Sequence, residues 1–467
     1  MYSNKFSKYL LKKKPIVKKL VDTLGQDFEY VSCLATDVKG TRLVANKQIT
    51  NISPSALTES GFVIKVKGKD LYFEYSTNEI SDKNFDFLLE EIKREAKKKQ
   101  TIKCVDAKVL EEEPLVKNFV RKNKGRDYTN KELLEMLKSK VEKYAKDDIV
   151  NAHVLIEKNE YSKMFISKKK ELTQYYVYNG VMCVAISYLN GSIKEGYAGK
   201  GYASLEEAID NLDSSVEYAI NVARTLQKAE APTPGIYDVI TAPSVTGLIV
   251  HEAFGHGVEM DMFVKDRAKA KEYVGKEVAS KLVSMHDGAK ACLSAASYFF
   301  DDDGVLAQDT LIIDKGILKR GISDALSAME LNTVPTGNSR RESYKRKAYT
   351  RMTNTFFEGG NSTLDEMIKS MDYGYLICDF NNGMEDPKNW GIQCTACYGK
   401  EIKNGEFTGK VIAPVVMSGY VIDLLKSITM ISKDIEILGT GSCGKGYKEY
   451  VRVSDGGGYM KARVKIG

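Results

Sequence analysis

The stretch from Val250 to Gly257 contains the residues of this 467-residue chain that are best suited to catalysis. It holds two of the four histidines, His251 and His256, and Glu252 directly follows the first of them. Two imidazoles can supply nitrogen ligands to zinc, and an adjacent carboxylate can act as a base toward a water molecule on the metal. The residue types therefore indicate a catalytic metal site. The spacing, His-Glu-x-x-x-His, is one residue longer than the familiar zinc peptidase signature.

The extra residue determines which local structure could serve such a site. Residues four apart lie about 40° apart around an α-helix, whereas residues five apart lie about 140° apart. A regular helix would therefore turn the two imidazoles away from each other. A single wide π-type turn would realign them, and Gly255 and Gly257 would ease the distortion. The alternative is a regular buried helix whose two histidines belong to the core and bind no metal.

A catalytic zinc site usually has a third protein ligand, and the sequence offers several candidates. The Cys-x-x-Cys pair of Cys394 and Cys397 has a common metal or redox spacing. The same segment also alternates like a β-strand, in which the two thiols would point to opposite faces. His286 lies in a turn-like segment, and His153 lies in an alternating strand where a core or surface role is expected.

Cys443 is the remaining candidate. It lies in the glycine-rich segment 439–446, which we interpret as a loop with room for a metal to approach. Lys445 lies two residues further on, where its charge would help to stabilise a thiolate. Spacing alone does not select Cys443, because the segment is far from His256 in the sequence.

Composition limits the classes of protein to which the chain can belong. Hydrophobic residues make up 43% and charged residues 28%, as in globular proteins. No apolar run approaches the roughly 20 residues needed to cross a membrane, and the apolar patch 9–11 is too short for a signal-peptide core. We therefore expect a cytoplasmic protein without a membrane partner, whose eight cysteines are reduced thiols or metal ligands.

The basic residues do not indicate a nucleic-acid surface. The net charge is +6, from 69 basic and 63 acidic residues. Basic clusters occur at 12–19, 93–99, 121–126 and 340–351, but acidic residues interleave several of them and no nucleic-acid motif accompanies them. We interpret these clusters as solvated helix faces and loops.

The pattern of elements predicts an α+β fold. Helical spacing of apolar residues predicts helices over 6–24, with an interruption at Pro15, over 85–99, and over 129–144, which begins at a Thr-x-x-Glu capping box. Strands are expected between them and from 153 to 197, with hairpin turns at Asn179-Gly180 and Asn190-Gly191. A capped helix follows from Ser204, and the proline-rich segment 231–235 is typical of a linker.

These elements predict two domains. Residues 1–230 would form a mixed domain of helices and antiparallel strands, with sub-units at about 1–125 and 126–230. Residues 236–467 would form a β-rich domain that carries the metal site.

Three stretches together resemble the TldD/PmbA family of zinc metallopeptidases. They are 251–261, which contains the His-Glu-x-x-x-His motif, 349–355 (Tyr-Thr-Arg-Met-Thr-Asn-Thr), and Ser442-Cys443-Gly444-Lys445 near the C-terminus. Within the family, the chain resembles the catalytic TldD type, because the inactive PmbA (TldE) subunit lacks the histidine motif. The resemblance implies that His251, His256 and Cys443 bind zinc and that Glu252 is the catalytic base. The Cys-x-x-Cys pair and the loops between 270 and 300 depart from the family pattern, which leaves the substrate preference open.

The resemblance also implies a substrate and a partner. The expected function is hydrolysis of unfolded or small peptides that enter a dimer tunnel and bind as an added β-strand. The partner would be a PmbA/TldE-like subunit or a second copy of the chain. The alternative function is that of a non-catalytic scaffold or gyrase-modulator-like protein with a structural metal.

Overall fold

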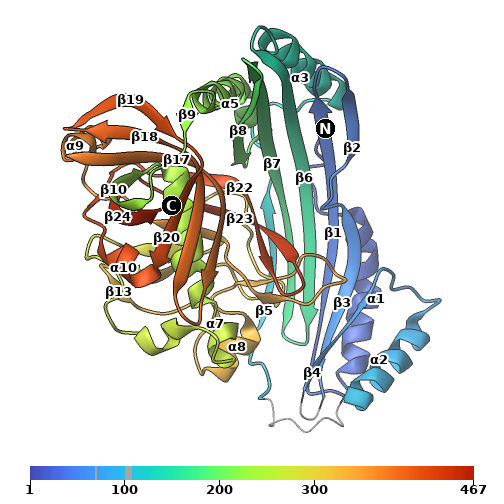
Figure 1. Cartoon of the computed structure of the whole chain (residues 1–467). Helices are drawn as coiled ribbons and strands as arrows, with labels where there is room; N and C mark the ends of the chain where they lie inside the picture. The colour runs from blue at the N-terminus through green and yellow to red at the C-terminus, as the bar shows by residue number, and fades with distance from the viewer. Residues whose placement is uncertain (69–70, 100–107) are drawn as a thin grey trace.

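The computed structural model describes residues 1–68, 71–99 and 108–467. It has the α+β architecture predicted from the sequence, with a mixed N-terminal half and a C-terminal half rich in strands. In Figure 1, the long strands of the N-terminal half stand beside the body formed by the C-terminal half. The division into domains at residue 230 stays a prediction.

A single sheet organises the N-terminal half. Its strands follow the order β4-β3-β1-β6-β7-β5, with β2 paired to β1 and β8 paired to β7. The pairs are antiparallel except for β5 with β7, and strands from both predicted sub-units share this sheet. The strands are β1 (Tyr30–Ala45), β2 (Thr50–Pro54), β3 (Glu59–Lys67), β4 (Tyr72–Thr77), β5 (Leu115–Arg121), β6 (Ile149–Ser167), β7 (Lys170–Leu189) and β8 (Ser192–Tyr202).

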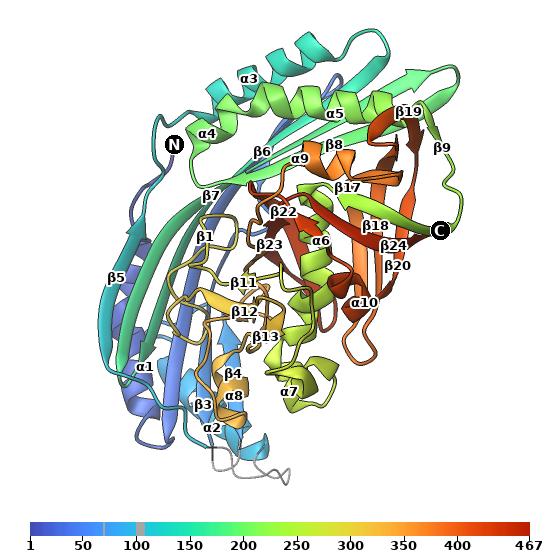
Figure 2. The same ribbon diagram turned by 90° about the vertical axis from the view of Figure 1, so that its left-hand side faces the viewer.

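Helices pack on one face of this sheet, and α5 also contacts the C-terminal half through Val222 (Figures 1 and 2). Apolar residues of α1 and α2 pack on β1 and β3, and those of α3 and α5 pack on β6 and β7. Burying these apolar stripes is the main source of stability for both layers. The helices of this half are α1 (Lys8–Leu24), α2 (Phe85–Lys99), α3 (Asn130–Tyr144), α4 (Leu205–Asp210) and α5 (Leu212–Leu226).

Two larger sheets build the C-terminal half. In the first, pairing runs around a closed ring, β17-β10-β24-β20-β18, and back to β17, with β19, β9 and β21 attached. The second has the order β13-β12-β11-β16-β23-β22. The strands of the first are β9 (Ala229–Glu230), β10 (Gly235–Thr241), β17 (Tyr373–Asp386), β18 (Gly391–Lys403), β19 (Glu406–Ile412), β20 (Val415–Tyr420), β21 (Met430–Ile431) and β24 (Met460–Ile466). Those of the second are β11 (Met285–Asp287), β12 (Thr310–Asp314), β13 (Ile317–Leu318), β16 (Asn354–Phe357), β22 (Glu436–Lys445) and β23 (Glu449–Gly457).

Helix α6 lies between these two sheets, as Figure 2 shows, and contacts β17 on one side and β23 on the other. Almost every residue of α6 is buried, which explains its continuous apolar sequence. The smaller elements of this half are α6 (Pro243–Val250), η1 (His251–Gly255), η2 (His256–Val258), α7 (Met260–Val264), η3 (Lys269–Tyr273), α8 (Ala325–Glu330), β14 (Ser339–Arg340), β15 (Tyr349–Thr350), α9 (Leu364–Lys369) and α10 (Val421–Lys426).

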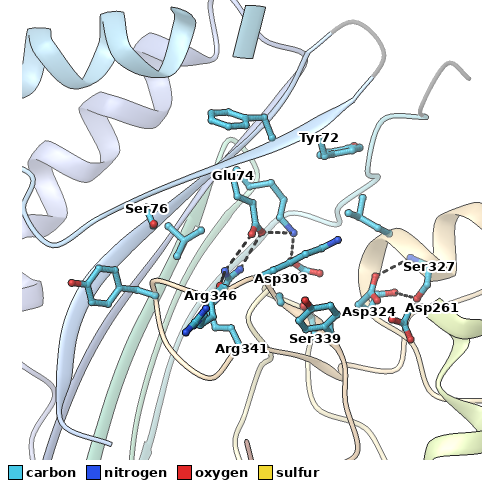
Figure 3. Close-up of a pocket in the computed structure, with 18 of the residues that line it drawn as sticks. Tyr72, Glu74, Ser76, Asp261, Asp303, Asp324, Ser327, Ser339, Arg341 and Arg346 are labelled. Carbon is cyan, nitrogen blue, oxygen red and sulfur yellow. Dashed lines mark hydrogen bonds and ion pairs between the residues drawn. The ribbon is translucent and has the colours of Figure 1, made fainter. Parts of the chain in front are cut away.

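Buried ion pairs join the two halves of the chain. Lys65 of β3 pairs with Asp303, and Arg341 pairs with Glu74 of β4 at 3.1 Å. Figure 3 shows this cluster on the wall of a cavity of about 520 Å³ between β4 and the segment 341–349. Arg341 and Arg351 are buried, so part of the basic cluster 340–351 is internal rather than a solvated surface.

Several local predictions can be compared with the structure. The capping box at Thr129 and the hairpin turn at Asn190-Gly191 are confirmed. The hairpin predicted at Asn179-Gly180 is wrong, because both residues lie inside β7, where the buried Asn179 amide bonds to the carbonyl oxygen of Tyr202. Helix α1 runs through Pro15, since the buried apolar face of the helix offsets the missing hydrogen bond. None of the helices in the described residues is long and apolar enough to cross a membrane.

Candidate metal centre

A π-helical turn follows directly from the buried helix α6 and carries the first two site residues. In this turn the backbone N–H of His256 donates to the carbonyl oxygen of His251, five residues earlier. The two imidazole rings therefore face the same region, with their centroids 5.0 Å apart and their planes at 88°. The wide turn predicted from the His-Glu-x-x-x-His spacing is confirmed. The regular helix of the alternative is excluded, and metal binding by the two histidines stays a prediction.

Glycine at position 255 permits the close packing of this turn. A β-carbon at Gly255 would lie 2.1 Å from the sulfur of Met352, which is fully buried. Any larger residue would therefore have to move either the turn or the Met352 side chain. The sequence thus provides both an extra residue for the wide turn and a residue small enough to fit it into the core.

Cys443 completes the group of ligand atoms. Its sulfur lies 3.4 Å from Nε2 of His256, and one ligand atom from each of His251, His256 and Cys443 lies within 4.8 Å of the others. Cys443 lies on strand β22, so the glycine-rich loop expected at 439–446 is wrong. The glycines instead allow an irregular strand, whose register with β23 shifts between Leu438 and Gly441.

The donor set fits zinc. Zinc binds imidazole nitrogen at about 2.0–2.1 Å and thiolate sulfur at about 2.3 Å in a tetrahedral arrangement. Ligand atoms at those bond lengths lie about 3.5 Å apart along an edge of the tetrahedron. The separation of 3.4 Å between the Cys443 sulfur and His256 Nε2 agrees with this value. Two imidazoles and one thiolate also leave a fourth position for water or substrate.

A carboxylate lies behind each imidazole. Nδ1 of His256 is 3.3 Å from a Glu259 oxygen, and Nδ1 of His251 is 3.9 Å from an Asp455 oxygen. Such outer carboxylates hold a ligating histidine in the tautomer whose Nε2 is free to bind the metal. Nδ1 of His251 has no hydrogen-bond partner among the described residues, so a small movement toward Asp455 would complete its pair.

The charges at the centre favour the thiolate form of Cys443. Burial opposes ionisation of this thiol, but the two imidazoles outweigh burial and hold its pKa well below the ordinary value. Burial opposes protonation of both imidazoles, and the Cys443 charge outweighs that effect and raises the pKa of each. Lys445, expected beside the thiolate, instead donates to Glu259 at 2.9 Å and to Asp261 at 2.7 Å. The lysine therefore acts on the carboxylate behind His256.

Glu252 lines a cavity of about 720 Å³ together with the three ligand candidates. The side chain packs against strand β17, where a β-carbon at Gly383 would lie only 2.5 Å from its Cγ. Glu252 follows His251 in the π turn, so one short element presents both an imidazole and a carboxylate to the cavity. The arrangement can hold a metal and place a proton acceptor beside it.

The other candidates from the sequence lie elsewhere. His286, on β11, is bonded to Asp309 at 2.7 Å and to Glu358 at 2.9 Å. His153 pairs with Asn46 in the N-terminal sheet. Cys394 and Cys397 lie on β18 and belong to two different apolar clusters, as expected for thiols on opposite faces of a strand. The seven cysteines that the structure describes are free thiols.

Sequence reasoning missed several polar residues of the site. Glu259 could have been found from its position three residues after His256, directly after the short helix η2. Asp455 is an isolated carboxylate before the glycines 456–458, and its closeness to His251 depends on the packing of α6 against β23. Glu385 lines the cavity from the end of β17, and nothing in its local sequence indicates that position.

Comparison with known proteins places the chain in a family. Residues 234–464 match the family model described as the PmbA/TldA metallopeptidase C-terminal domain. The chain belongs to the TldD/PmbA family. The matched region contains the π turn, Glu252 and Cys443, so the residues of the candidate centre all lie within the part that defines the family.

Curated relatives of the family carry metalloprotease names. A metalloprotease of Methanocaldococcus jannaschii is 32% identical over 63% of this chain and 64% of its own length. A metalloprotease TldD homolog of Buchnera aphidicola is 32% identical over 50% of this chain and 48% of its own. A zinc metalloprotease TldD homolog of Saccharolobus solfataricus is 31% identical over 51% and 53%. The chain thus spans less than two-thirds of the length of each relative, and zinc is named for one of the three.

Solved structures share the fold over nearly the whole chain. TldE from Thermococcus kodakarensis superposes with a TM-score of 0.75 at 15% identity, covering 97% of this chain and 100% of its own. A Thermotoga maritima protein described as a candidate modulator of a DNA gyrase superposes with a TM-score of 0.77 at 17% identity, with the same coverage. These likenesses extend the family fold to the N-terminal sheet, which the family model does not cover.

Proposed function

We propose that this chain is a zinc-dependent metallopeptidase that hydrolyses bonds in unfolded or small peptides. In this proposal His251, His256 and Cys443 bind the metal and Glu252 is the general base. The main support for this proposal is the arrangement of these residues. The π turn brings the two imidazoles together, and Cys443 lies beside them on the wall of a cavity that Glu252 also lines.

A zinc ion held by these residues would supply a Lewis acid to polarise the peptide carbonyl and to make water acidic near neutral pH. Glu252 takes a proton from the attacking water and later delivers it to the leaving amine. Glu259 and Asp455 keep the two imidazoles oriented, so that their Nε2 atoms remain available. His251 is 6% and Glu252 7% exposed, so an extended chain can reach them more easily than a folded surface can.

The open cavity favours catalysis over a structural metal. A structural zinc site is closed by four protein ligands, whereas a catalytic one keeps a position for water. Three ligand atoms converge here among the described residues, and they face a cavity of about 720 Å³. A gyrase-modulator-like scaffold with a structural metal is the alternative, and removal of the metal by a chelator separates the two. If the metal is structural, the protein should unfold when the metal is removed. If the metal is catalytic, the protein should stop cleaving peptides and keep its fold.

A partner subunit forms part of the proposal. The fold is shared with TldE of Thermococcus kodakarensis, which supports pairing with a PmbA/TldE-like subunit, and a second copy of this chain is the other candidate. Activity should therefore be measured on the purified chain alone and after co-expression with a TldE-like subunit. Molecular mass in solution distinguishes the two assemblies.

Glu252→Gln tests the catalytic assignment directly. Cleavage of an unstructured peptide should fall by at least about 10²-fold, because the base is lost while its shape is kept. Zinc content, measured by elemental analysis, should stay at the wild-type value. Cys443→Ser is the paired variant, and it should lower zinc content. Full activity in the first variant would overturn the assignment of the base, and unchanged zinc in the second would exclude Cys443 as a ligand.

A further inference from the structure

Glu385 stands at the boundary between two cavities. It lies near the end of β17, and together with Met384 it lines both the metal-centre cavity and a second cavity of about 980 Å³. The second cavity is lined largely by apolar groups, including Ile392 and Met417 of neighbouring strands. A peptide bound at the metal centre would therefore pass Glu385 before its next residues reach the apolar cavity.

The Glu385 carboxyl group has no partner of its own. Both of its oxygens are buried, and neither accepts or donates a hydrogen bond within the described residues. Burial raises the pKa of Glu385 to about 9, although the nearby His256 opposes this effect, and the charge of Glu252 adds to it. Buried carboxylates are normally paired, because an isolated one loses its hydration without compensation. Without a partner, the group thus favours its neutral acid form, and a cation beside it would favour the carboxylate.

Two of the three lysine and arginine side chains that line the metal-centre cavity are engaged with carboxylates. Lys445 donates to Glu259, Asp261 and the carbonyl oxygen of Thr350, and Lys265 pairs with Asp261 at 3.3 Å. Nδ1 of His256 lies beside Glu259. Glu385 is also outside the group of His251, His256 and Cys443 whose ligand atoms converge. Arg267 also lines this cavity, but its guanidinium makes no hydrogen bond to Glu385. A molecule that enters the cavity can therefore supply the donor that Glu385 lacks.

We propose that Glu385 forms an amine subsite that binds a cationic nitrogen of the peptide substrate. This inference rests on the proposed peptidase function and deepens it by naming a feature of the substrate. The nitrogen is either the free α-ammonium of the peptide or the side chain of a lysine or arginine. An ammonium or guanidinium group would supply the missing donors and stabilise the ionised carboxylate. Peptides with such a group should bind and react better than neutral analogues.

Two matched peptide pairs identify the source of the nitrogen. The first compares a peptide that has a free N-terminus with its acetylated form, and the second compares a lysine with norleucine, which keeps the stem but lacks the charge. With the zinc-loaded protein and its partner subunit, if one is required, kcat/KM should favour one cationic peptide by at least about tenfold, equal to about 1.4 kcal/mol. Glu385→Gln should reduce that ratio to near one. Asp386→Asn changes a neighbouring carboxylate that already bonds to Asn389, and it should keep the wild-type ratio.

Binding provides a readout that does not require turnover. Fluorescence anisotropy of the same labelled peptides on the Glu252→Gln protein should show the same preference, and adding Glu385→Gln should remove it. If neither cationic peptide of the pairs binds or reacts better than its neutral form, the amine subsite is excluded. It is also excluded if the ratio survives in Glu385→Gln. If the preference in binding holds but no peptide is cleaved, the subsite stands and the proposed peptidase function falls.

Discussion

The two histidines of the centre differ in how firmly they are held. His256 has Glu259 at 3.3 Å, and Lys445 fixes that carboxylate in turn. His251 depends on Asp455, which lies 3.9 Å away on a different strand. Burial raises the pKa of Asp455 to about 6, although His251 opposes this effect. The orientation of His251 therefore depends on one carboxylate from a distant part of the chain.

Asp455→Asn should weaken zinc binding by about 10- to 100-fold, because an amide orients the His251 imidazole less strongly than a carboxylate. Competition with a chromophoric chelator measures this affinity. Asp365→Asn makes the same chemical change at an exposed position on α9 and should leave the affinity at the wild-type value. Equal affinity in Asp455→Asn and wild type would mean that His251 is positioned by the π turn alone.

At the scale of elements, strand β17 shapes the cavity beside the π turn. Its register with β18 shifts between Phe380 and Asn382, and beyond this irregularity Gly383 lies against Glu252. Glycine leaves the Glu252 side chain room that any other residue would occupy. The strand thus shapes the position of Glu252, the proposed base, without contributing a reactive group of its own at this point.

Gly383→Ala should lower kcat by about 10²-fold while zinc content stays unchanged, because the new β-carbon would displace Glu252 and not the metal ligands. A β-carbon at Gly383 would lie 2.5 Å from Cγ of Glu252, whereas one at Gly391 of neighbouring β18 would meet nothing within 4 Å. Gly391→Ala is therefore the matched control, with kcat close to wild type. Steady-state kinetics on one peptide compares the three proteins. Similar kcat values for both variants would contradict this role of β17.

The sequence predicts correctly those features that depend on only a few neighbouring residues. The capping box at Thr129 and the wide turn after His251 are of this kind, since both follow from the geometry of one helix. The glycines around Cys443 predict a loop, but the segment is a strand. It forms by pairing with β23, and the local sequence does not reveal this pairing. Asn179-Gly180 failed as a turn for the same reason, since β7 continues through it between two partner strands. Asp455 and Glu385 lie at the site because segments far apart in the sequence pack together, so the local sequence does not predict them.

At the scale of the whole molecule, ion pairs and apolar contacts hold the C-terminal half on the N-terminal sheet. Lys163 of β6 pairs with Asp302, and Gln174 of β7 bonds to the carbonyl oxygen of Phe300 at 2.9 Å. The side chain of Phe300 packs with residues on the inner face of the sheet. Segment 300–303 thus connects the two halves through charge, hydrogen bonding and apolar contact at once.

Glu74 makes this connection sensitive to acid. Its carboxylate lies between Lys65 at 3.3 Å and Arg341 at 3.1 Å. Burial opposes its ionisation, but the two cations outweigh burial and lower the pKa of Glu74 from its ordinary value of about 4.5 to about 2. Because the folded pKa is the lower one, the carboxylate stabilises the fold above pH 4.5 and loses this effect as the pH falls toward 2. The contribution at neutral pH is on the order of 3 kcal/mol.

Glu74→Gln should therefore lower the melting temperature most at pH 7, and the difference from wild type should shrink as the pH falls from 5 to 3. At low pH the wild-type carboxyl becomes protonated and resembles the neutral amide, whereas at neutral pH the variant leaves Lys65 and Arg341 with fewer partners. Scanning calorimetry across this range measures the difference. Glu142→Gln, on the exposed face of α3, should follow the wild-type curve throughout. A constant difference between Glu74→Gln and wild type at every pH would show that Glu74 acts through packing and not through its charge.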